Sequence, residues 1–354
     1  MIRFADEWVA LGRILSILVN MLVGKIGPTA SQSWQEICEP IQPFLDEVSE
    51  QLEQAINSFD PQIATFVQYA LGSRGKQLRP GLVALSARAS GGINVHHVNA
   101  AVIIEMVHLA TLVHDDVVDG AEVRRDRPTL TANWGNKVAV LAGDCLFAEA
   151  LRLAATLPTT EVCELVSQSA KVVCTGEIRQ TLQRGNFQLS REEYLELVRM
   201  KTAELFALGC ELGARLAAPG KSEVHKALRE YGLQLGIAYQ IYDDCLDVFG
   251  EENRVGKSLG TDLVTGKATL PVLIALERAD EIEYKAWISM LKEGGAQADT
   301  IREGLATREI PAACRAVVED YIVSANTCVD GLPAATALHG LSDCLMNQLV
   351  ILSE

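Results

Sequence analysis

The chain has 354 residues, a formal net charge of −15 and 49% hydrophobic residues. So acidic a chain excludes nucleic acid as the expected partner, because phosphate backbones require a basic surface. The eleven prolines leave long proline-free tracts, such as 81–127 and 159–218, that are rich in helix-forming residues. No linker-like composition interrupts the chain. We therefore expect an all-α fold, with one large helical domain over residues 31–354 and an extra apolar helix within residues 1–30.

Nine cysteines are scattered along the chain without any C-x-x-C pattern, which is typical of reduced thiols in a cytoplasmic protein. Near the N-terminus, residues 14–23 form an apolar run that is too short to span a bilayer. The positive start and small-residue cleavage site of a signal peptide are not evident. We expect this run to form a packed extra helix. The alternative is a helix through residues 8–23 that makes weak contact with a membrane surface or docks onto a partner.

A basic loop follows the first predicted helix of the large domain. Helical periodicity predicts that helix over residues 34–58, and the segment 72–80 then reads GSRGKQLRP. The glycines of this segment allow backbone to approach an anion, and Lys76 and Arg79 can donate charge-assisted hydrogen bonds to phosphate. Basic surface loops are common, so the loop alone is only a candidate phosphate-binding element.

The next predicted helix covers residues 95–119 and is apolar on nearly all sides until its end. It ends on Asp115, Asp116 and Asp119, at positions i, i+1 and i+4, and we expect these three side chains to share one face. Gly120 is a typical helix stop. Carboxylates crowded at the negative end of a helix require a cation, and Mg²⁺ is commonly shared between carboxylates and substrate phosphates.

Two arginines, Arg124 and Arg125, come directly after this acidic helix. They can be simple neutralising charges, or they can bind phosphates whose other oxygens are held by metal ions. The combination of an acidic and a basic cluster favours the second interpretation, because a phosphate ester needs both kinds of partner. Further helices are predicted over residues 136–156, 161–184 and 190–216, the last of which begins with a capping box.

The acidic pattern then recurs at the end of another apolar helix. Asp243, Asp244 and Asp247 repeat the i, i+1, i+4 spacing, and Gly250 follows them. If both motifs face one cavity, the six carboxylates must be bridged by cations, because uncompensated buried anions are very costly. One such motif is a weak signal. Two motifs, each followed by Lys or Arg, favour a metal–diphosphate site over a structural role.

Residues 72–271 resemble the trans-isoprenyl diphosphate synthases, the chain-elongating polyprenyl synthases. The motifs occur in the family's order and spacing: GKQLRP, EMVHLATLVHDDVVD, RRDRPT, GNKVAVLAGD, KTAELF, YQIYDDCLD and GKSLGTD. The resemblance implies an all-α bundle around a central cavity, usually a homodimer, with three Mg²⁺ ions per active site. It also implies head-to-tail condensation of isopentenyl diphosphate with an allylic diphosphate, which gives a polyprenyl diphosphate and releases diphosphate.

The resemblance assigns roles to individual residues. The metal ligands it implies are Asp115, Asp116, Asp119, Asp243, Asp244 and Asp247. The allylic diphosphate contacts it implies are Arg124, Lys201, Thr202, Gln240, Lys257 and Lys267. The isopentenyl diphosphate contacts it implies are Lys76, Arg79, His108 and Arg125. The six aspartates with Lys201 and Lys257 form the implied catalytic group.

Ala110 and Thr111 bear on the length of the product. They are the fifth and fourth residues before Asp115, where farnesyl enzymes of this family carry a bulky aromatic residue. A small Ala110 therefore predicts a product longer than farnesyl. The alternatives are a synthase of farnesyl or geranylgeranyl length, and a non-catalytic regulatory subunit of a heteromeric synthase. Such subunits tend to lose an aspartate motif or the basic residues, and this chain keeps both.

Overall fold

The structure is a computed structural model that describes residues 33–72, 77–125, 127–250, 259–306 and 309–352. The helix expected within residues 1–30 lies outside these ranges, and so do Lys76 and Lys257. Within the described ranges the chain is almost entirely helical, which confirms the all-α prediction. None of the helices in those ranges is long and apolar enough to cross a bilayer.

The elements follow one another with short connections. The first group of helices is α2 (Trp34–Cys38), η1 (Glu39–Ile41), α3 (Gln42–Asn57), α4 (Pro61–Leu71), α5 (Leu78–Ser90) and α6 (Val95–Val118). A hairpin of β1 (Val123–Arg124) and β2 (Arg127–Pro128) pairs Val123 with Pro128 and Arg124 with Arg127. The central helices are α7 (Leu130–Ala154), α8 (Thr160–Leu182), α9 (Arg191–Val198), η2 (Arg199–Ala203), α10 (Glu204–Ala217) and α11 (Ser222–Phe249). The last group is α13 (Thr261–Val264), α14 (Leu270–Arg278), α15 (Glu281–Glu293), η3 (Gly294–Gln297), α16 (Ala298–Ala306), α17 (Ile310–Val329), α18 (Thr336–Gln348) and η4 (Leu349–Leu352).

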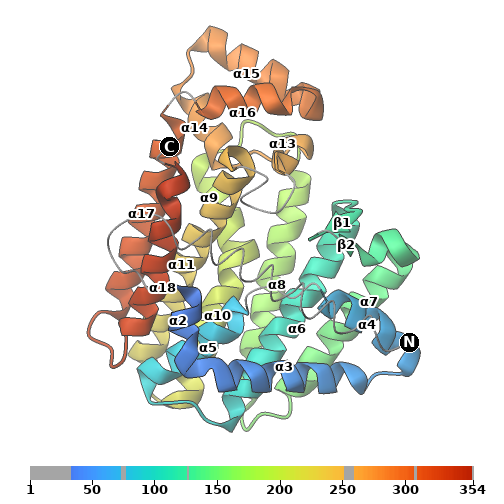
Figure 1. The fold of residues 1–354 in the computed structure, drawn as a ribbon, viewed down its shortest axis with the longest axis vertical. Coiled ribbons are helices and arrows are strands. Elements are labelled where there is room, and N and C mark those ends of the chain that lie inside the picture. The colour runs from blue at the N-terminus through green and yellow to red at the C-terminus, as the bar shows by residue number, and fades with distance from the viewer. Residues whose placement is uncertain (1–32, 73–76, 126, 251–258, 307–308, 353–354) are drawn as a thin grey trace, which may run out of the picture.

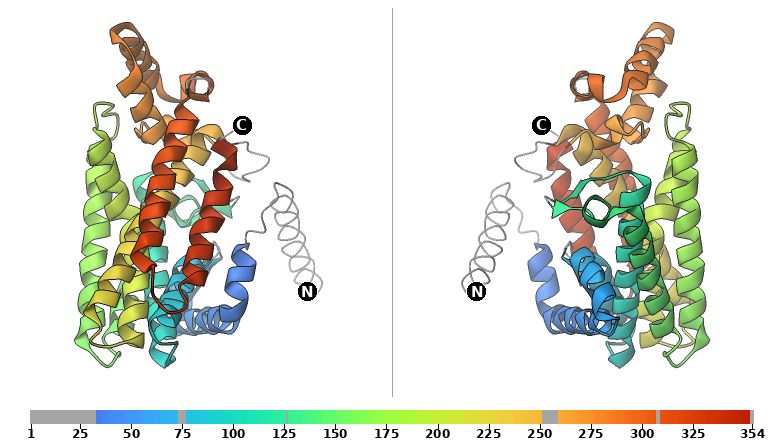
Figure 2. Two further views of the ribbon diagram at one scale, coloured as in Figure 1. Left: turned by 90° about the vertical axis from the view of Figure 1, so that its left-hand side faces the viewer. Right: turned by 90° about the vertical axis from the view of Figure 1, so that its right-hand side faces the viewer.

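The long helices form a bundle along the longest axis of the molecule (Figure 1). In it, α6 packs against α7, α10, α3 and α5, while α11 packs against α10 and α17. Helices α17 and α18 lie side by side on one face, and α15 with α16 forms the tip above them (Figure 2). The acidic motifs end α6 and α11, so this packing decides where the two motifs meet.

Helix α6 is the centre of the core, as its apolar sequence predicts. Ile103, Ile104 and Met106 are fully buried, and burial of each such side chain contributes about 1.5–3 kcal/mol. The Asn94 side chain accepts a hydrogen bond from the His96 amide and starts the helix. Gly120 adopts a positive φ of 61° just beyond its end. The predicted helix 95–119 is therefore confirmed to within one residue.

Several other boundaries differ from the predicted ones. The predicted helix 34–58 is divided into α2, η1 and α3, because Pro40 and Pro43 lack the N–H that a continuous helix uses. Helix α4 was not predicted. Helix α7 begins at Leu130, before its predicted start, and kinks at Gly135, where φ is 81°. The residues that cause these differences are prolines and a glycine, which change the backbone without changing the apolar pattern.

The predicted helix 190–216 contains an irregularity that positions the site. Its start is the expected capping box, in which Ser190 and Glu193 each accept a hydrogen bond from the other's backbone amide. Between α9 and α10, η2 is a π-helix, and the amide of Glu204 donates to the carbonyl of Arg199, five residues earlier. Short π-helical turns occur often at functional sites because they displace side chains from the regular helical face.

Two glycines allow α11 to approach η2 and α10 closely. A Cβ at Gly236 would lie 2.6 Å from the Cα of Ala203, and a Cβ at Gly232 would lie 2.7 Å from the Cα of Ala207. Both distances are too short for any side chain. Only glycine therefore permits this contact, which brings the last turns of α11 beside η2.

Candidate active site

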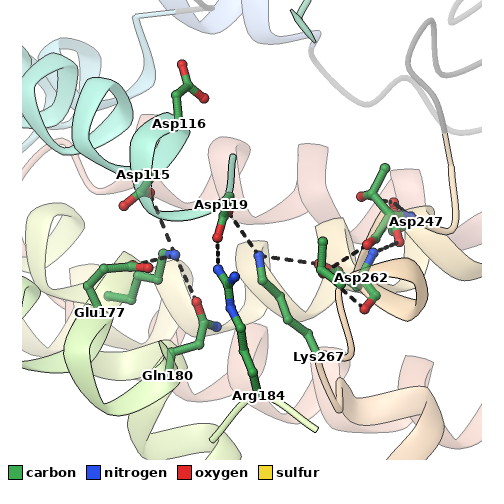
Figure 3. A network of polar contacts seen from close by, with 12 residues as sticks. Asp115, Asp116, Asp119, Glu177, Gln180, Arg184, Asp247, Asp262 and Lys267 are labelled. Carbon is green, nitrogen blue, oxygen red and sulfur yellow. Dashed lines mark hydrogen bonds and ion pairs between the residues drawn. The ribbon is translucent and has the colours of Figure 1, made fainter. Parts of the chain in front are cut away.

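Both acidic motifs line one cavity of about 320 Å³ between α6, α8, α9, η2, α11 and the segment around α13. Six aspartates and four basic side chains line it. These charged residues are Asp115, Asp119, Arg124, Arg184, Lys201, Asp243, Asp244, Asp247, Asp262 and Lys267. Carboxylates from α6 and from α11 therefore form two walls of one cavity, with basic side chains between them (Figure 3).

On the α6 wall, Asp115 faces a lysine from η2. The Lys201 ammonium lies 3.6 Å from Asp115 Oδ2 and 2.5 Å from Glu177 Oε2. Lys201 also donates a hydrogen bond to Gln180 Oε1 at 2.9 Å. Burial raises the pKa of Asp115 to about 6, although the charge of Lys201 opposes this shift. This carboxylate is therefore mostly, but not completely, ionised at neutral pH.

Asp116 does not share the face of Asp115 and Asp119. Its Oδ1 accepts a hydrogen bond of 2.7 Å from Arg124 Nε, and its side chain points away from the other two (Figure 3). Consecutive helical residues differ by about 100° in direction, so positions i and i+4 align and position i+1 does not. The expectation that all three side chains share one face is therefore wrong for Asp116.

Asp119, at the end of α6, is held by two cations. Arg184, from the loop after α8, is bound to Asp119 Oδ1, and the Lys267 ammonium lies 3.4 Å from Asp119 Oδ2 (Figure 3). Lys267 also lies 3.8 Å from Asp262 Oδ1. Lys267 was expected near a diphosphate, whereas Arg184 was not predicted.

On the α11 wall, Asp244 is fixed by hydrogen bonds from two sides. Tyr194 donates to its Oδ2 at 2.6 Å, and Gln240 Nε2 donates to its Oδ1 at 2.7 Å. Burial raises the pKa of Asp244 to about 8, and the charge of Asp262 adds to that shift. Asp244 therefore takes up a proton readily in the ligand-free protein.

Asp247 organises the segment that follows α11. Its Oδ1 accepts a hydrogen bond from the Thr261 hydroxyl at 2.9 Å, and its Oδ2 accepts one from the Asp262 amide at 3.0 Å. The amide of Gly260 donates to its carbonyl at 2.8 Å. These bonds hold the start of α13 against the cavity, so that Asp262 faces the basic side chains.

The π-helix η2 directs two consecutive side chains into the cavity. Lys201 and Thr202 both line it, and the Thr202 hydroxyl donates to Gln240 Oε1 at 2.7 Å. The widened turn, together with Gln240 from α11, forms the polar wall that joins α8 to α11.

Three of the residues expected to hold the second diphosphate, Arg79, His108 and Arg125, form a separate basic cluster. Burial, together with the charges of Arg79 and Arg125, holds the pKa of His108 well below its usual range, so this imidazole is neutral. Burial also lowers the pKa of Arg79, whose guanidinium lies 5.1 Å from the centre of the Phe206 ring. Arg125 has a positive φ of 51° in the turn between β1 and β2. None of the three lines the acidic cavity.

The two residues expected to control product length lie inside α6. Ala110 is fully buried, and the Thr111 hydroxyl donates to the carbonyl of His108 at 2.7 Å. Neither of them lines the cavity, whereas Leu112, the next residue, does. Their role in product length stays a prediction.

The carboxylates of the cavity are the ligand type that Mg²⁺ prefers. No three His, Cys, Asp or Glu side chains in the described part of the chain converge into a ready-made metal site. In phosphate-binding sites, Mg²⁺ usually takes one or two carboxylates and completes its shell with water and phosphate oxygens. Pairs such as Asp115 with Asp119, and Asp243 with Asp244, fit that requirement without a cage made of protein alone.

Two functional candidates were missed by the sequence reasoning. Tyr194 comes from α9 and is buried against Asp244, and nothing in its local sequence distinguishes it from a core aromatic residue. Arg184 precedes Gly185 in the loop QRGN, and a basic residue beside a loop glycine was the available signal. Both depend on contacts between distant segments of the chain.

Comparison with known proteins agrees with this geometry. The model of the polyprenyl synthetase family matches residues 60–307. Heptaprenyl diphosphate synthase component 2 of Bacillus subtilis is 34% identical over 84% of this chain and 85% of its own. The crystal structure of a decaprenyl diphosphate synthase from Rhodobacter capsulatus is 31% identical, with a TM-score of 0.82 over 89% of this chain and 99% of its own. A polyprenyl synthase from Caulobacter crescentus, complexed with calcium and isoprenyl diphosphate, is 32% identical, with a TM-score of 0.84 over 90% of this chain and 99% of its own. The chain therefore belongs to the polyprenyl synthetase family.

Proposed function

We propose that this family member is a chain-elongating trans-prenyltransferase. It condenses isopentenyl diphosphate with an allylic diphosphate, head to tail, and releases diphosphate. The observation that carries the proposal is the meeting of the two acidic motifs in one cavity with Arg124, Lys201 and Lys267 between them. Carboxylates on two sides and cations between them match the needs of a bound metal–diphosphate complex.

The acidic cavity is the proposed site of the allylic diphosphate. Asp115 and Asp119 on one wall, and Asp243 and Asp244 on the other, would hold Mg²⁺, with three ions as the expected number. Asp116 holds Arg124, and Asp247, which also lines the cavity, holds the start of α13. Bound Mg²⁺ neutralises the charge that develops on the departing diphosphate.

The basic side chains of the cavity stabilise the same charge directly. Lys201, Lys267 and Arg124 donate to the diphosphate oxygens, while Thr202 and Gln240 hold one another in position beside them. Lys257, outside the described residues, is expected to join this set. As the C–O bond breaks, the electron pair leaves with the diphosphate, and the allylic carbon becomes a cation.

The basic cluster holds the second substrate. Arg79 and Arg125 bind the diphosphate of isopentenyl diphosphate, with Lys76 as a further expected contact. The neutral His108 imidazole can donate a hydrogen bond without adding charge. The double bond of isopentenyl diphosphate attacks the allylic cation, a new C–C bond forms, and a proton is lost to the released diphosphate. No protein nucleophile is required.

The proposed product is longer than farnesyl. Ala110 supports this length because it places no bulk on the helix along which the growing chain is expected to run. Relatives whose names specify heptaprenyl and decaprenyl products support it as well. A product of farnesyl or geranylgeranyl length is the alternative.

A second candidate function is that of a subunit in a heteromeric synthase. One relative is named as component 2 of a heptaprenyl diphosphate synthase, which favours this candidate. The six aspartates that line the cavity favour catalysis by this chain in either case.

We propose a homodimer as the default assembly. Exposed apolar side chains on α7 and α8 support an interface there: Trp134, Leu141, Leu151, Ile178 and Leu182.

A cytoplasmic location is also proposed. All nine cysteines are free thiols, as expected in a reducing compartment. Residues 1–30 are proposed as an extra helix outside the catalytic domain, and a membrane-surface contact through residues 8–23 is its alternative role.

The purified full-length chain tests the proposed function directly. Incubation with Mg²⁺, farnesyl diphosphate and labelled isopentenyl diphosphate should release diphosphate and give labelled products longer than farnesyl diphosphate. EDTA should abolish both. Absence of elongation in the isolated chain, followed by elongation after addition of a second subunit, would support the heteromeric candidate. Absence of elongation under both conditions would refute the proposal.

A further inference from the structure

Arg184 lies among the residues proposed to bind diphosphate but has not been given a role of its own. It lies in the loop after α8, lines the acidic cavity and is bound to Asp119 Oδ1. Lys267 lies 3.4 Å from the other oxygen of the same carboxylate. Both oxygens of Asp119 therefore face a protein cation.

The loops that carry these two cations are connected to each other. The amide of Gly185 donates to the carbonyl of Gly266 at 2.9 Å. Gly185 follows Arg184 and Gly266 precedes Lys267, so one backbone hydrogen bond fixes the relative positions of the two side chains. Both glycines have positive φ angles, 74° and 71°, which non-glycine residues rarely adopt. The two cations are thus presented by a direct connection between the loop after α8 and the segment after α13.

Not all hydrogen-bond donors of the Arg184 guanidinium are paired. Its Nε is buried and has no hydrogen-bond partner among the residues that the structure describes. Buried donors in folded proteins are nearly always paired, so the present contacts leave the hydrogen-bonding capacity of this guanidinium unfilled. Arginine has five donors in a planar fork that matches phosphate oxygens, and one carboxylate oxygen satisfies few of them.

We propose that Arg184 is a further diphosphate-binding residue that exchanges partners when ligands bind. In the ligand-free protein it pairs with Asp119. When a metal–diphosphate complex enters, Arg184 moves to the diphosphate oxygens and Asp119 becomes a metal ligand. This inference rests on the proposed function, since it takes the acidic cavity as the allylic diphosphate site.

The exchange makes metal binding and diphosphate binding dependent on each other. A metal ion alone has to compete with Arg184 for Asp119, and diphosphate removes that competitor. By linkage, any factor by which diphosphate improves metal affinity is also the factor by which metal improves diphosphate affinity. Removal of Arg184 should therefore change the two affinities in opposite directions, whereas simple damage to the site would weaken both.

Binding of Mn²⁺, an EPR-visible substitute for Mg²⁺, tests the exchange without any turnover. Mn²⁺ is titrated into wild type and Arg184→Gln, and inorganic diphosphate is then titrated at saturating Mn²⁺. In Arg184→Gln we expect Mn²⁺ alone to bind several-fold more tightly and diphosphate to bind about tenfold more weakly, as loss of one charge-assisted hydrogen bond predicts. Arg184→Lys should keep the Mn²⁺ affinity near wild type and give an intermediate loss for diphosphate.

Arg179→Gln is the matched control, because Arg179 is an exposed arginine of α8 outside the cavity. It should change neither affinity, and thermal melts should show that every variant is folded. Unchanged or weaker Mn²⁺ binding in Arg184→Gln would overturn the proposal, as would unchanged diphosphate binding or equal effects in Arg179→Gln. Failure of elongation in wild type would instead count against the proposed function, since none of these measurements requires elongation.

Discussion

The carboxyl group of Asp244 makes the stability of the ligand-free protein depend on pH. Its pKa is raised from 3.8 to about 8, mainly by burial, so the folded state binds a proton that the unfolded state releases. A group with a raised acid pKa stabilises the fold at low pH and loses that contribution as pH rises towards the folded pKa. Asp115, with a pKa of about 6, acts in the same direction over a lower range.

Asp244→Asn removes this dependence while keeping an acceptor for Tyr194. In EDTA, the melting temperature of the variant should exceed that of wild type by an amount that grows as pH rises from about 5 to about 8. Asp343→Asn, an exposed position on α18, serves as the control and should give a constant difference. A difference between Asp244→Asn and wild type that does not vary with pH would show that Asp244 ionises normally.

Ala110→Tyr tests the assignment of product length. The added ring must enter the interior beside α6, because Ala110 is fully buried, and overpacking of this kind costs about 1–3 kcal/mol. Products should shorten towards farnesyl length while the rate of the first condensation is largely kept. The measurement is chromatography of labelled products. Ala110→Val should shorten them less, and an unchanged product distribution in Ala110→Tyr would refute the assignment.

At the scale of single residues, the sequence predicted which residues form the site better than it predicted where their side chains point. Asp115 with Asp119, and Asp243 with Asp247, reach the predicted cavity because i and i+4 spacing and helix ends are local properties. Asp116 was misplaced because the rotation between neighbouring residues was given too little weight. The pairing of Arg184 with Asp119 depends on how two distant loops pack, and no local pattern encodes that contact.

At the scale of the elements, the position of η2 against α8 depends on a glycine of α8. A Cβ at Gly176 would lie 2.8 Å from Met200 Cβ and 3.2 Å from the Lys201 amide nitrogen. Gly176→Ala should therefore push η2 away and displace Lys201. The clash should cost about 1–3 kcal/mol, which exceeds the gain of about 1 kcal/mol from better helix propensity.

The measurements for Gly176→Ala are the melting temperature and the KM for the allylic diphosphate, and we expect the first to fall and the second to rise. Gly209→Ala is the control, since its new Cβ would have only ordinary contacts, the nearest at 3.5 Å. It should be neutral or slightly stabilising. A Gly176→Ala variant with wild-type stability and KM would show that η2 tolerates displacement.

The helices themselves were largely predictable, because long apolar patterns and caps are local signals. The exceptions were elements whose shape depends on one residue or on a neighbour. The hairpin of β1 and β2 is too short to show an alternating pattern, and η2 differs from an α-helix only in its hydrogen bonding. The predicted helix 34–58 was interrupted by prolines that an apolar count does not register.

At the scale of the whole molecule, the proposed homodimer is expected to form through the surface of α7. Leu141 is 63% exposed, and a leucine side chain contributes about 1.5–3 kcal/mol when fully buried. Leu141→Glu should raise the dimer dissociation constant at least about tenfold, because the interface would also bury a charge. Light scattering after size-exclusion chromatography at several protein concentrations measures this change.

Ile282→Glu is the control for that surface. Ile282 is 81% exposed on α15, at the tip of the molecule away from α7. It should leave the assembly unchanged. Equal effects of the two substitutions, or a wild-type chain that is monomeric at all concentrations, would contradict the proposed interface.

The fold class could be predicted from the sequence. The arrangement of the helices in space could not. Periodicity shows which side of a helix is apolar but not which helix covers it. Contacts such as Gly236 against Ala203 decide that pairing. A glycine inside a helix can serve several purposes, so the sequence alone does not identify such a contact. The resemblance of the motifs to a known family supplied the central cavity that the pattern alone did not.

The widened turn of η2 also accommodates one residue more than a regular turn does. Deletion of one residue between Arg199 and Ala203 would therefore give a regular α-helical turn and leave α9 and α10 in nearly the same relative orientation. Tyr194 on α9 is anchored to Asp244, and Glu204 on α10 is anchored to Arg229 at 2.8 Å, so both flanks would keep their contacts. The fold should therefore tolerate a single-residue deletion here better than one inside a regular helix such as α8, where one side would rotate by about 100° against the other. The effect of the deletion should fall on Lys201 and Thr202, whose directions the wide turn sets.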